Sequence, residues 1–129
     1  MLIMLADDQE QNLKLMEMLC LADGHESVSV RYQDQILRTA VQQQPDIIVL
    51  DIFMPGETNG LDVLRELRRN TDTAHIPVMT VSSGFGVELH TESMEAGANM
   101  FLPRPFSASA WSKAIASLEE NFKAMSVWT

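Results

Sequence analysis

The feature that most constrains this sequence is the run Ile47-Ile48-Val49-Leu50, which leads directly into Asp51. Four consecutive apolar residues, three of them β-branched, are typical of a short strand buried on both faces of a parallel sheet. Turn residues follow at once, at Pro55, Gly56 and Gly60. Asp51 is therefore expected at the carboxyl end of this strand, where open α/β sheets place their binding sites. An Asp there can also simply satisfy the backbone of a loop.

Acidic residues outnumber basic ones: 18 Asp and Glu stand against 9 Lys and Arg, a formal net charge of −9. A chain so charged is poorly suited to bind nucleic acid or an anionic membrane surface, but it can bind a cation. The single cysteine, Cys20, cannot form an internal disulfide, and no apolar run approaches the ~20 residues of a membrane helix. Residues 1–6 lack the basic segment of a signal peptide. We therefore expect a cytoplasmic protein without membrane insertion.

Short apolar runs alternate with amphipathic stretches along the chain. The runs predict five strands, at residues 2–6, 27–31, 47–51, 76–81 and 99–102. Apolar residues at steps of three and four predict five helices, at residues 9–21, 34–43, 61–69, 88–96 and 108–123. In the third helix the leucines share one face, which places Arg68 on the solvent side. This alternation favours a single α/β domain with an open parallel sheet covered by helices on both faces.

Polar residues follow the carboxyl ends of four predicted strands, and all such ends lie on one edge of a parallel sheet. They are Asp7 and Asp8, Asp51, Ser82 with Ser83, and Arg104. Three carboxylates this close repel one another unless a cation neutralises them, and a hard divalent cation such as Mg²⁺ prefers oxygen ligands. A carboxylate beside a cation, a hydroxyl and an arginine can also accept a phosphoryl group as a nucleophile.

Several motifs resemble, in their expected order, the receiver domain of two-component response regulators of the chemotaxis-regulator type. They are Asp7-Asp8, Asp51 with Met54-Pro55 and Gly60, the strand 76–81 ending in Ser82, and Gly97-Ala98 leading to Pro105-Phe106. The resemblance covers nearly the whole chain. It implies a doubly wound, flavodoxin-like fold with five strands in the order 2-1-3-4-5 and five helices. It also implies a receiver domain over residues 1–124, followed by a short C-terminal tail at 125–129.

The resemblance further implies roles for single residues. Asp51 matches the phosphoacceptor, and Asp8 and Asp51 match direct Mg²⁺ ligands, together with the backbone carbonyl of Phe53. Asp7 matches an acid that acts on the ion through water. Ser82 matches the switch hydroxyl that follows the phosphoryl group.

By the same resemblance, a sensor histidine kinase or a phosphotransfer protein would donate the phosphoryl group, as in a phosphorelay. The aspartyl phosphate would then bias Ser82 and the switch aromatic Phe101. No DNA-binding segment follows, so output is expected through protein contacts on a face built from residues 88–96, Phe101 and 108–123, without direct nucleic acid binding. Such a domain is a phosphoacceptor that can catalyse its own phosphorylation and dephosphorylation, not a metabolic enzyme.

One position departs from the family pattern. Receiver domains have a lysine where this chain has Arg104, and by the resemblance that cation pairs with the acceptor aspartate and then with the phosphoryl group. Arginine keeps the charge, but its planar guanidinium binds carboxylate and phosphate with a different geometry, so the exchange is not conservative. Three outcomes remain open. Phosphorylation persists with an altered rate or lifetime, signal coupling is weakened, or the chain is a protein-interaction module that is no longer phosphorylated.

Two smaller points complete the comparison with other classes. The loop 54–60 is one residue longer than the common form, and Glu57 within it either approaches the metal or is a solvated surface acid. An aspartyl phosphatase of the haloacid-dehalogenase type needs a second acid where this chain has Phe53, and no glycine-rich phosphate-binding loop occurs. Both enzyme and nucleotide-binding readings are therefore disfavoured.

Overall fold

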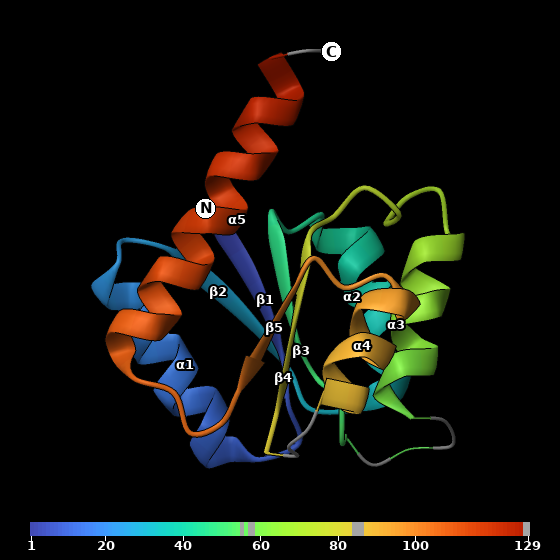
Figure 1. Cartoon of the computed structure of the whole chain (residues 1–129), viewed down its shortest axis with the longest axis horizontal. Coiled ribbons are helices and arrows are strands. Elements are labelled where there is room, and N and C mark those ends of the chain that lie inside the picture. The colour runs from blue at the N-terminus through green and yellow to red at the C-terminus, as the bar shows by residue number, and fades with distance from the viewer. Residues whose placement is uncertain (55, 57–58, 84–86, 128–129) are drawn as a thin grey trace.

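The computed structural model describes residues 1–54, 56, 59–83 and 87–127, with the side chains of 87 and 122–127 left undescribed. Five parallel strands form one sheet in the order β2-β1-β3-β4-β5 (Figure 1). The strands are β1 (Leu2–Ala6), β2 (Glu26–Val30), β3 (Ile47–Asp51), β4 (Val78–Ser82) and β5 (Met100–Pro103). This confirms the predicted fold and strand order.

Helices cover both faces of the sheet (Figure 1). They are α1 (Glu10–Ala22), the short 3₁₀ helix η1 (Gln33–Gln35), α2 (Ile36–Gln43), α3 (Gly60–Arg69), α4 (Val87–Ala96) and α5 (Ala108–Val127). One face carries α1 and α5, and the other carries α2, α3 and α4. No helix in the described part of the chain combines the length and the hydrophobicity that crossing a lipid bilayer requires.

Strand β3 explains why both faces must be covered, because all five of its residues are buried. Successive strand residues point to opposite faces. Ile48 and Leu50 accordingly pack with α2, α3 and α4, whereas Ile47 and Val49 pack with α1 and α5. The unbroken apolar run in the sequence is thus the result of two hydrophobic clusters that meet in the central strand.

The ends of some elements differ from the sequence-based expectation. Strand β4 begins at Val78, after Pro77, and includes Ser82. Strand β5 includes Pro103, which an edge strand tolerates because its outer side has no partner strand. Helix α5 continues to Val127 instead of ending at Lys123, and its last turns extend beyond the sheet (Figure 1).

Arg68 is not on the solvent side, as the helical pattern predicted, but is half-buried at the amino ends of β4 and β5. Its guanidinium donates to the backbone oxygens of Gly97 (2.9 Å), Ile76 (2.7 Å) and Ala74 (3.1 Å), and to the side-chain oxygen of Asn99 (2.8 Å). The long side chain allows a residue next to the apolar stripe to reach around the helix. Arg68 therefore ties α3 to both strands and to the turn after α4.

Candidate functional site

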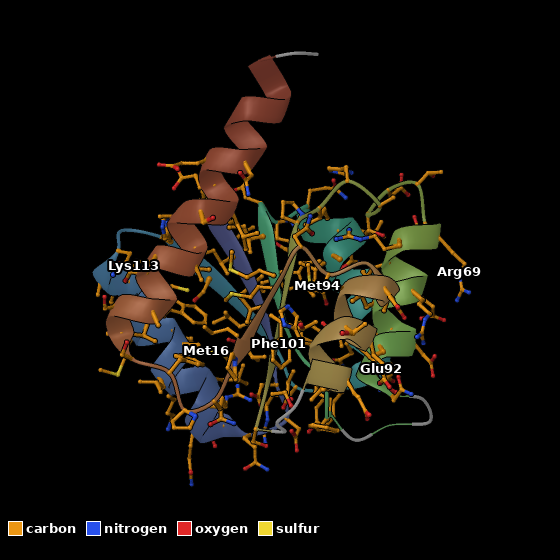
Figure 2. The ribbon with its side chains drawn as sticks, in the orientation of Figure 1. Met16, Arg69, Glu92, Met94, Phe101 and Lys113 are labelled. Carbon is orange, nitrogen blue, oxygen red and sulfur yellow. The ribbon has the colours of Figure 1, made fainter. Side chains whose placement is uncertain are left out.

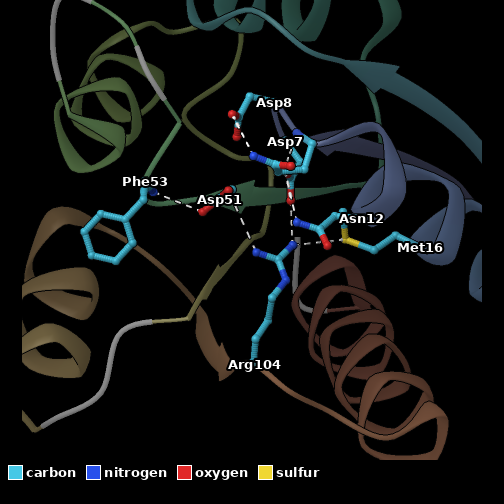
Figure 3. Close-up of polar contacts among 8 residues, drawn as sticks. Asp7, Asp8, Asn12, Met16, Asp51, Phe53 and Arg104 are labelled. Carbon is cyan, nitrogen blue, oxygen red and sulfur yellow. Dashed lines mark hydrogen bonds and ion pairs between the residues drawn. The ribbon is translucent and has the colours of Figure 1, made fainter.

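Three carboxylates meet at the carboxyl edge of the sheet (Figure 3). Asp7 and Asp8 follow β1, and Asp51 ends β3, its neighbour in the sheet. One oxygen of each lies within 4.8 Å of the others. The register pairs Ala6 with Leu50, so residues that follow these two positions must emerge side by side. The predicted convergence of the acids is present in the structure.

Asp7 is fully buried, and protein donors occupy both of its oxygens. Its Oδ2 accepts a hydrogen bond from Arg104 Nη2 at 2.6 Å, which is also an ion pair. Its Oδ1 accepts from the backbone N–H of Gln9 at 2.8 Å and from the amide of Asn12 at 3.5 Å (Figure 3). A carboxylate so completely bonded to protein groups has little capacity left to bind an ion directly.

Asp51 is held more loosely. Its Oδ1 accepts from the backbone N–H of Phe53 at 3.0 Å, and its Oδ2 lies 3.8 Å from Arg104 Nη1. The pKa of Asp51 is raised from 3.8 to about 6, chiefly because burial disfavours the charged form. The charges of Asp7 and Asp8 raise this pKa further, whereas the Phe53 N–H and Arg104 lower it. The negative charge of Asp51 is thus only partly compensated by the groups around it.

Arg104 lies between the two acids and is only 16% exposed. One amino group pairs with Asp7 and the other faces Asp51, an arrangement that a planar fork allows and a single ammonium group does not. The same Nη2 lies 4.0 Å from the Met16 sulfur, and the Arg104 backbone N–H donates to the carbonyl of Ser82 at 2.7 Å. The side chain is therefore anchored on Asp7, the acid that is not the predicted phosphoacceptor.

The other residues singled out in the sequence lie around this cluster. Asp8 is half-buried and accepts from the Gln9 side chain at 3.5 Å. Ser82 is fully buried at the end of β4, and Phe53, whose backbone N–H bonds Asp51, is 59% exposed. Phe101 is on β5 and stacks on His90 of α4, with ring centroids 5.3 Å apart.

Sequence reasoning missed two residues that shape the site. Asn12, from the first turns of α1, donates to Asp7, and Met16, one turn further, packs against Arg104. Helical spacing from Asp7 could have pointed to Asn12, but nothing in the sequence signals the contact of Met16 with a residue 88 positions away.

The loop before α3 depends on a glycine. The N–H of Gly60 donates to the carbonyl of Ile52 at 3.0 Å, and a Cβ at Gly60 would lie 2.4 Å from that oxygen. Only glycine permits this approach, which closes the loop directly behind Asp51. Asn59 then caps α3 by accepting from the backbone N–H of Asp62. Glu57 lies outside the described residues.

The cluster fits a hard divalent cation. Its donors are carboxylate oxygens, the ligands that Mg²⁺ prefers. Three acids against one arginine leave the site net negative. A bound cation would offset both the burial that chiefly raises the pKa of Asp51 and the repulsion by Asp7 and Asp8 that raises it further. Asp8 and Asp51 keep more free oxygen capacity than Asp7 does.

Residues 3–116 match the model of the response regulator receiver domain family. The chain is 35% identical to the response regulator PleD of Caulobacter vibrioides over 103 residues, which is 80% of this chain but 22% of PleD. It is 31% identical to the polar-differentiation response regulator DivK of Brucella anthropi over 116 residues, or 89% of this chain and 93% of DivK. The chain thus spans about a fifth of the length of one relative and nearly all of the other.

Solved structures agree on the fold. The signal receiver domain of a putative Luxo repressor protein from Vibrio parahaemolyticus superposes with a TM-score of 0.88 at 20% identity, covering 98% of this chain and 95% of that one. Chemotaxis protein CheY4 of Vibrio cholerae gives a TM-score of 0.83 at 19% identity, covering 91% and 97%. Because the family model matches residues 3–116, most of the chain, and the solved structures share its fold, this chain belongs to the response regulator receiver domain family.

Proposed function

We propose that the chain is a phosphorylation-controlled receiver in two-component signalling and that Asp51 is its phosphoacceptor. The observation that carries this proposal is the meeting of Asp51 with two further acids and Arg104 at one edge of the sheet. Among the three acids only Asp51 lies within a strand, at its end, and Arg104 is the cation nearest to its Oδ2, at 3.8 Å, among the described residues. The fully bonded Asp7 is unsuited to attack.

The chemistry follows from the two oxygens of Asp51. The Phe53 N–H holds Oδ1, so Oδ2 is the oxygen that attacks the phosphorus of a phosphohistidine on a kinase or phosphotransfer protein. An O–P bond forms, the N–P bond breaks, and the electron pair returns to the imidazole, which then takes up a proton. With a pKa of about 6, Asp51 is mostly ionised at neutral pH and can act as the nucleophile.

Asp8, Asp51 and the backbone carbonyl of Phe53 would hold Mg²⁺ directly, and Asp7 would act on it through water. When bound, the ion supplies positive charge that offsets the charge of the phosphoryl oxygens. Arg104 adds N–H donors that face Asp51 Oδ2, and its ion pair with Asp7 would keep those donors in place during transfer.

Output would pass through Ser82 and Phe101 to the face formed by residues 88–96, Phe101 and 108–123. On α4 this face exposes Glu88, Glu92 and Glu95 and no lysine or arginine. Charge complementarity therefore favours a protein partner with a basic surface over nucleic acid. We place the domain at residues 1–124, with 125–129 as a tail, in the cytoplasm.

Incubation with acetyl phosphate and Mg²⁺, followed by intact-mass measurement, tests the assignment. The wild-type protein is expected to gain one phosphoryl group, and Asp51→Asn is expected to gain none. Chelation of divalent cations should abolish the adduct on the wild type. An equal adduct on Asp51→Asn would rule out Asp51 as the acceptor.

A second candidate function has one observation in its favour. Arg104 pairs with Asp7 at 2.6 Å and with Asp51 only at 3.8 Å, so the cation that should follow the phosphoryl group is bound elsewhere. In that case the domain would be a receiver-like interaction module that is not phosphorylated. The absence of an adduct on the wild type, together with its appearance on Arg104→Lys, would establish this second function.

A further inference from the structure

A pair of buried hydroxyl groups links the sheet to α4. Thr80, in the middle of β4, and Ser93, in the middle of α4, are both fully buried, and their side-chain oxygens share a hydrogen bond. Thr80 Oγ1 also donates to the backbone carbonyl of Met100 on β5, at 3.3 Å. Because Thr80 has one hydroxyl proton, Ser93 then donates to Thr80. The hydrogen bonds run from α4 through β4 to β5.

This link matters because the described inner side of α4 offers little apolar packing. Its inward positions include Leu89, which is partly buried, and the small residues Ser93 and Ala96. The side of α5 that faces the sheet is apolar by contrast: Trp111, Ala114, Ile115 and Leu118 are all buried in one hydrophobic cluster. The hydroxyl pair therefore adds a buried polar link between the sheet and a helix that has few described apolar contacts, whereas α5 is held by hydrophobic burial.

Thr80 also lies between the two residues that the proposed function uses as switches. Ser82 is two residues further along β4 and so points to the same face. Phe101 is its registered partner across the β4–β5 pair and stacks on His90 of α4. His90 lies three residues before Ser93, so both contacts come from one side of the helix. Figure 2 shows Phe101 on β5 beside α4, on which Glu92 and Met94 are labelled.

We propose that Thr80 and Ser93 are positioning residues that hold α4 in its resting place and couple it to the state of the phosphoacceptor edge. The proposal rests on the proposed function, since phosphorylation of Asp51 is what would move Ser82, Phe101 and β5. A shift of β5 alters the Met100 carbonyl that Thr80 bonds, which weakens the bond between Thr80 and Ser93. Release of α4 then changes the output face.

A double-mutant cycle with Thr80→Val and Ser93→Ala tests the link. Thr80→Val leaves the Ser93 hydroxyl buried without Thr80, Ser93→Ala leaves Thr80 with the Met100 carbonyl alone, and the double variant removes both hydroxyls. The urea midpoint should fall in each single variant, and in the double variant it should fall by less than the two single losses combined. If the losses of the two single variants simply add, the hydroxyls do not act as a pair and the proposal fails.

Amide hydrogen exchange supplies the readout that a merely structural role would not give. In the double variant the α4 amides should exchange roughly fivefold faster than in the wild type, the factor for one net hydrogen bond, with α5 unchanged. Acetyl phosphate and Mg²⁺ should raise α4 exchange in the wild type but add little in the double variant. Equal α4 exchange in both proteins, or an equal response to the phosphodonor, would overturn the proposal.

Thr73→Val is the matched control. The Thr73 hydroxyl is also fully buried and donates to the Leu67 carbonyl at 2.7 Å, but it lies in the α3–β4 connection. Its loss should lower the urea midpoint without raising α4 exchange relative to α5. Intact mass of the double variant should still show the adduct. If no protein forms an adduct, the proposed function fails, whereas the basal exchange of α4 still decides whether the hydroxyl pair holds the helix.

Discussion

Two arginines serve opposite ends of the sheet, and their partners differ in kind. At the amino ends of β4 and β5, Arg68 donates to three backbone carbonyls and to Asn99. At the carboxyl edge, Arg104 faces Asp7 at 2.6 Å and Asp51 at 3.8 Å, with Asp8 in the same cluster. The first cation meets neutral acceptors at fixed positions, and the second meets an excess of negative charge.

The difference separates stability from function. The contacts of Arg68 use all three nitrogens of its guanidinium and fix α3 at the amino ends of two strands. Protein acceptors thus bond each of these nitrogens, so the contacts are structural. Burial chiefly raises the pKa of Asp51, the charges of Asp7 and Asp8 raise it further, and Arg104 offsets only part of that rise, so the acid cluster keeps an excess of negative charge. Stability that depends on pH and Mg²⁺ should therefore reside at the Arg104 end alone.

The largest effect is expected from Arg104→Met. This change leaves the buried Asp7 without its counter-ion, so the free energy of unfolding at neutral pH should fall by about 3–5 kcal/mol. Lowering the pH or adding Mg²⁺ should restore part of that loss, because protons or the ion relieve the repulsion among the acids. Urea titrations at several pH values, with and without Mg²⁺, measure it. A loss that is the same under all conditions would contradict the assignment of Arg104 to charge compensation.

Arg68→Met should lower the free energy of unfolding by about 2–4 kcal/mol, because several partly buried carbonyls lose their donor. This loss should be independent of Mg²⁺, and the phosphoryl adduct on Asp51 should persist. Arg69→Met is the matched control: Arg69 is exposed and points away from the body (Figure 2), so the change should stay within about 0.5 kcal/mol. A dependence of the Arg68→Met loss on Mg²⁺ would show that the two ends are coupled.

Asp51→Asn should stabilise the protein when divalent cations are absent. The pKa of Asp51 rises from 3.8 to about 6 on folding, so the native state binds more protons than the unfolded state in that range. Wild-type stability therefore falls as the pH rises through this range, by at most about 3 kcal/mol. The Asn variant lacks this decrease, and its advantage should be full above a pH of about 7 and absent below a pH of about 4. An advantage that grows toward low pH would have the wrong sign.

Mg²⁺ should stabilise the wild type by about 1.4 kcal/mol at ten times its Kd, by mass action on the native state. Asp8→Asn should remove most of this gain, because Asp8 keeps more free oxygen capacity than Asp7. Asp62→Asn is the control, since Asp62 is on α3 and pairs with Arg65. Thermal or urea unfolding across a Mg²⁺ series gives the comparison. An equal gain in stability in the wild type and in Asp8→Asn would show that the ion binds outside this cluster.

Backbone-level features of the molecule could be predicted from its sequence because they depend on local patterns. The bounds of β3 follow from one apolar run, and the meeting of Asp7, Asp8 and Asp51 follows from the rule that parallel strands share an edge. The hydrogen bond between Thr80 and Ser93 had a signal in the sequence as well, since Thr80 interrupts an apolar strand, but its partner could not be named from spacing alone.

The sequence could not predict which acceptors the long side chains bond. Arg68 and Arg104 both have long, flexible stems, and the acceptors that each finds are 6 to 97 residues away. The helical pattern predicted that Arg68 is in solvent, but its guanidinium is bonded to backbone carbonyls. The family resemblance predicted that the cation at position 104 pairs with Asp51, but the shortest ion pair of Arg104 is with Asp7. Such choices depend on three-dimensional distances of a few ångströms, which no periodicity encodes.

The smallest change in stability is expected from Arg104→Lys, and it isolates geometry from charge. A lysine keeps the positive charge near Asp7, so the free energy of unfolding should change by less than about 1 kcal/mol. A single ammonium group cannot hold Asp7 and face Asp51 with separate nitrogens, as the guanidinium does. The rate at which acetyl phosphate labels Asp51, and the lifetime of the adduct, should therefore change more than the stability does. Time-resolved intact mass of both proteins at matched Mg²⁺ measures these quantities. Identical labelling and decay would show that the fork geometry of Arg104 is irrelevant to the phosphoryl group, and that this end of the sheet uses its arginine only as a charge.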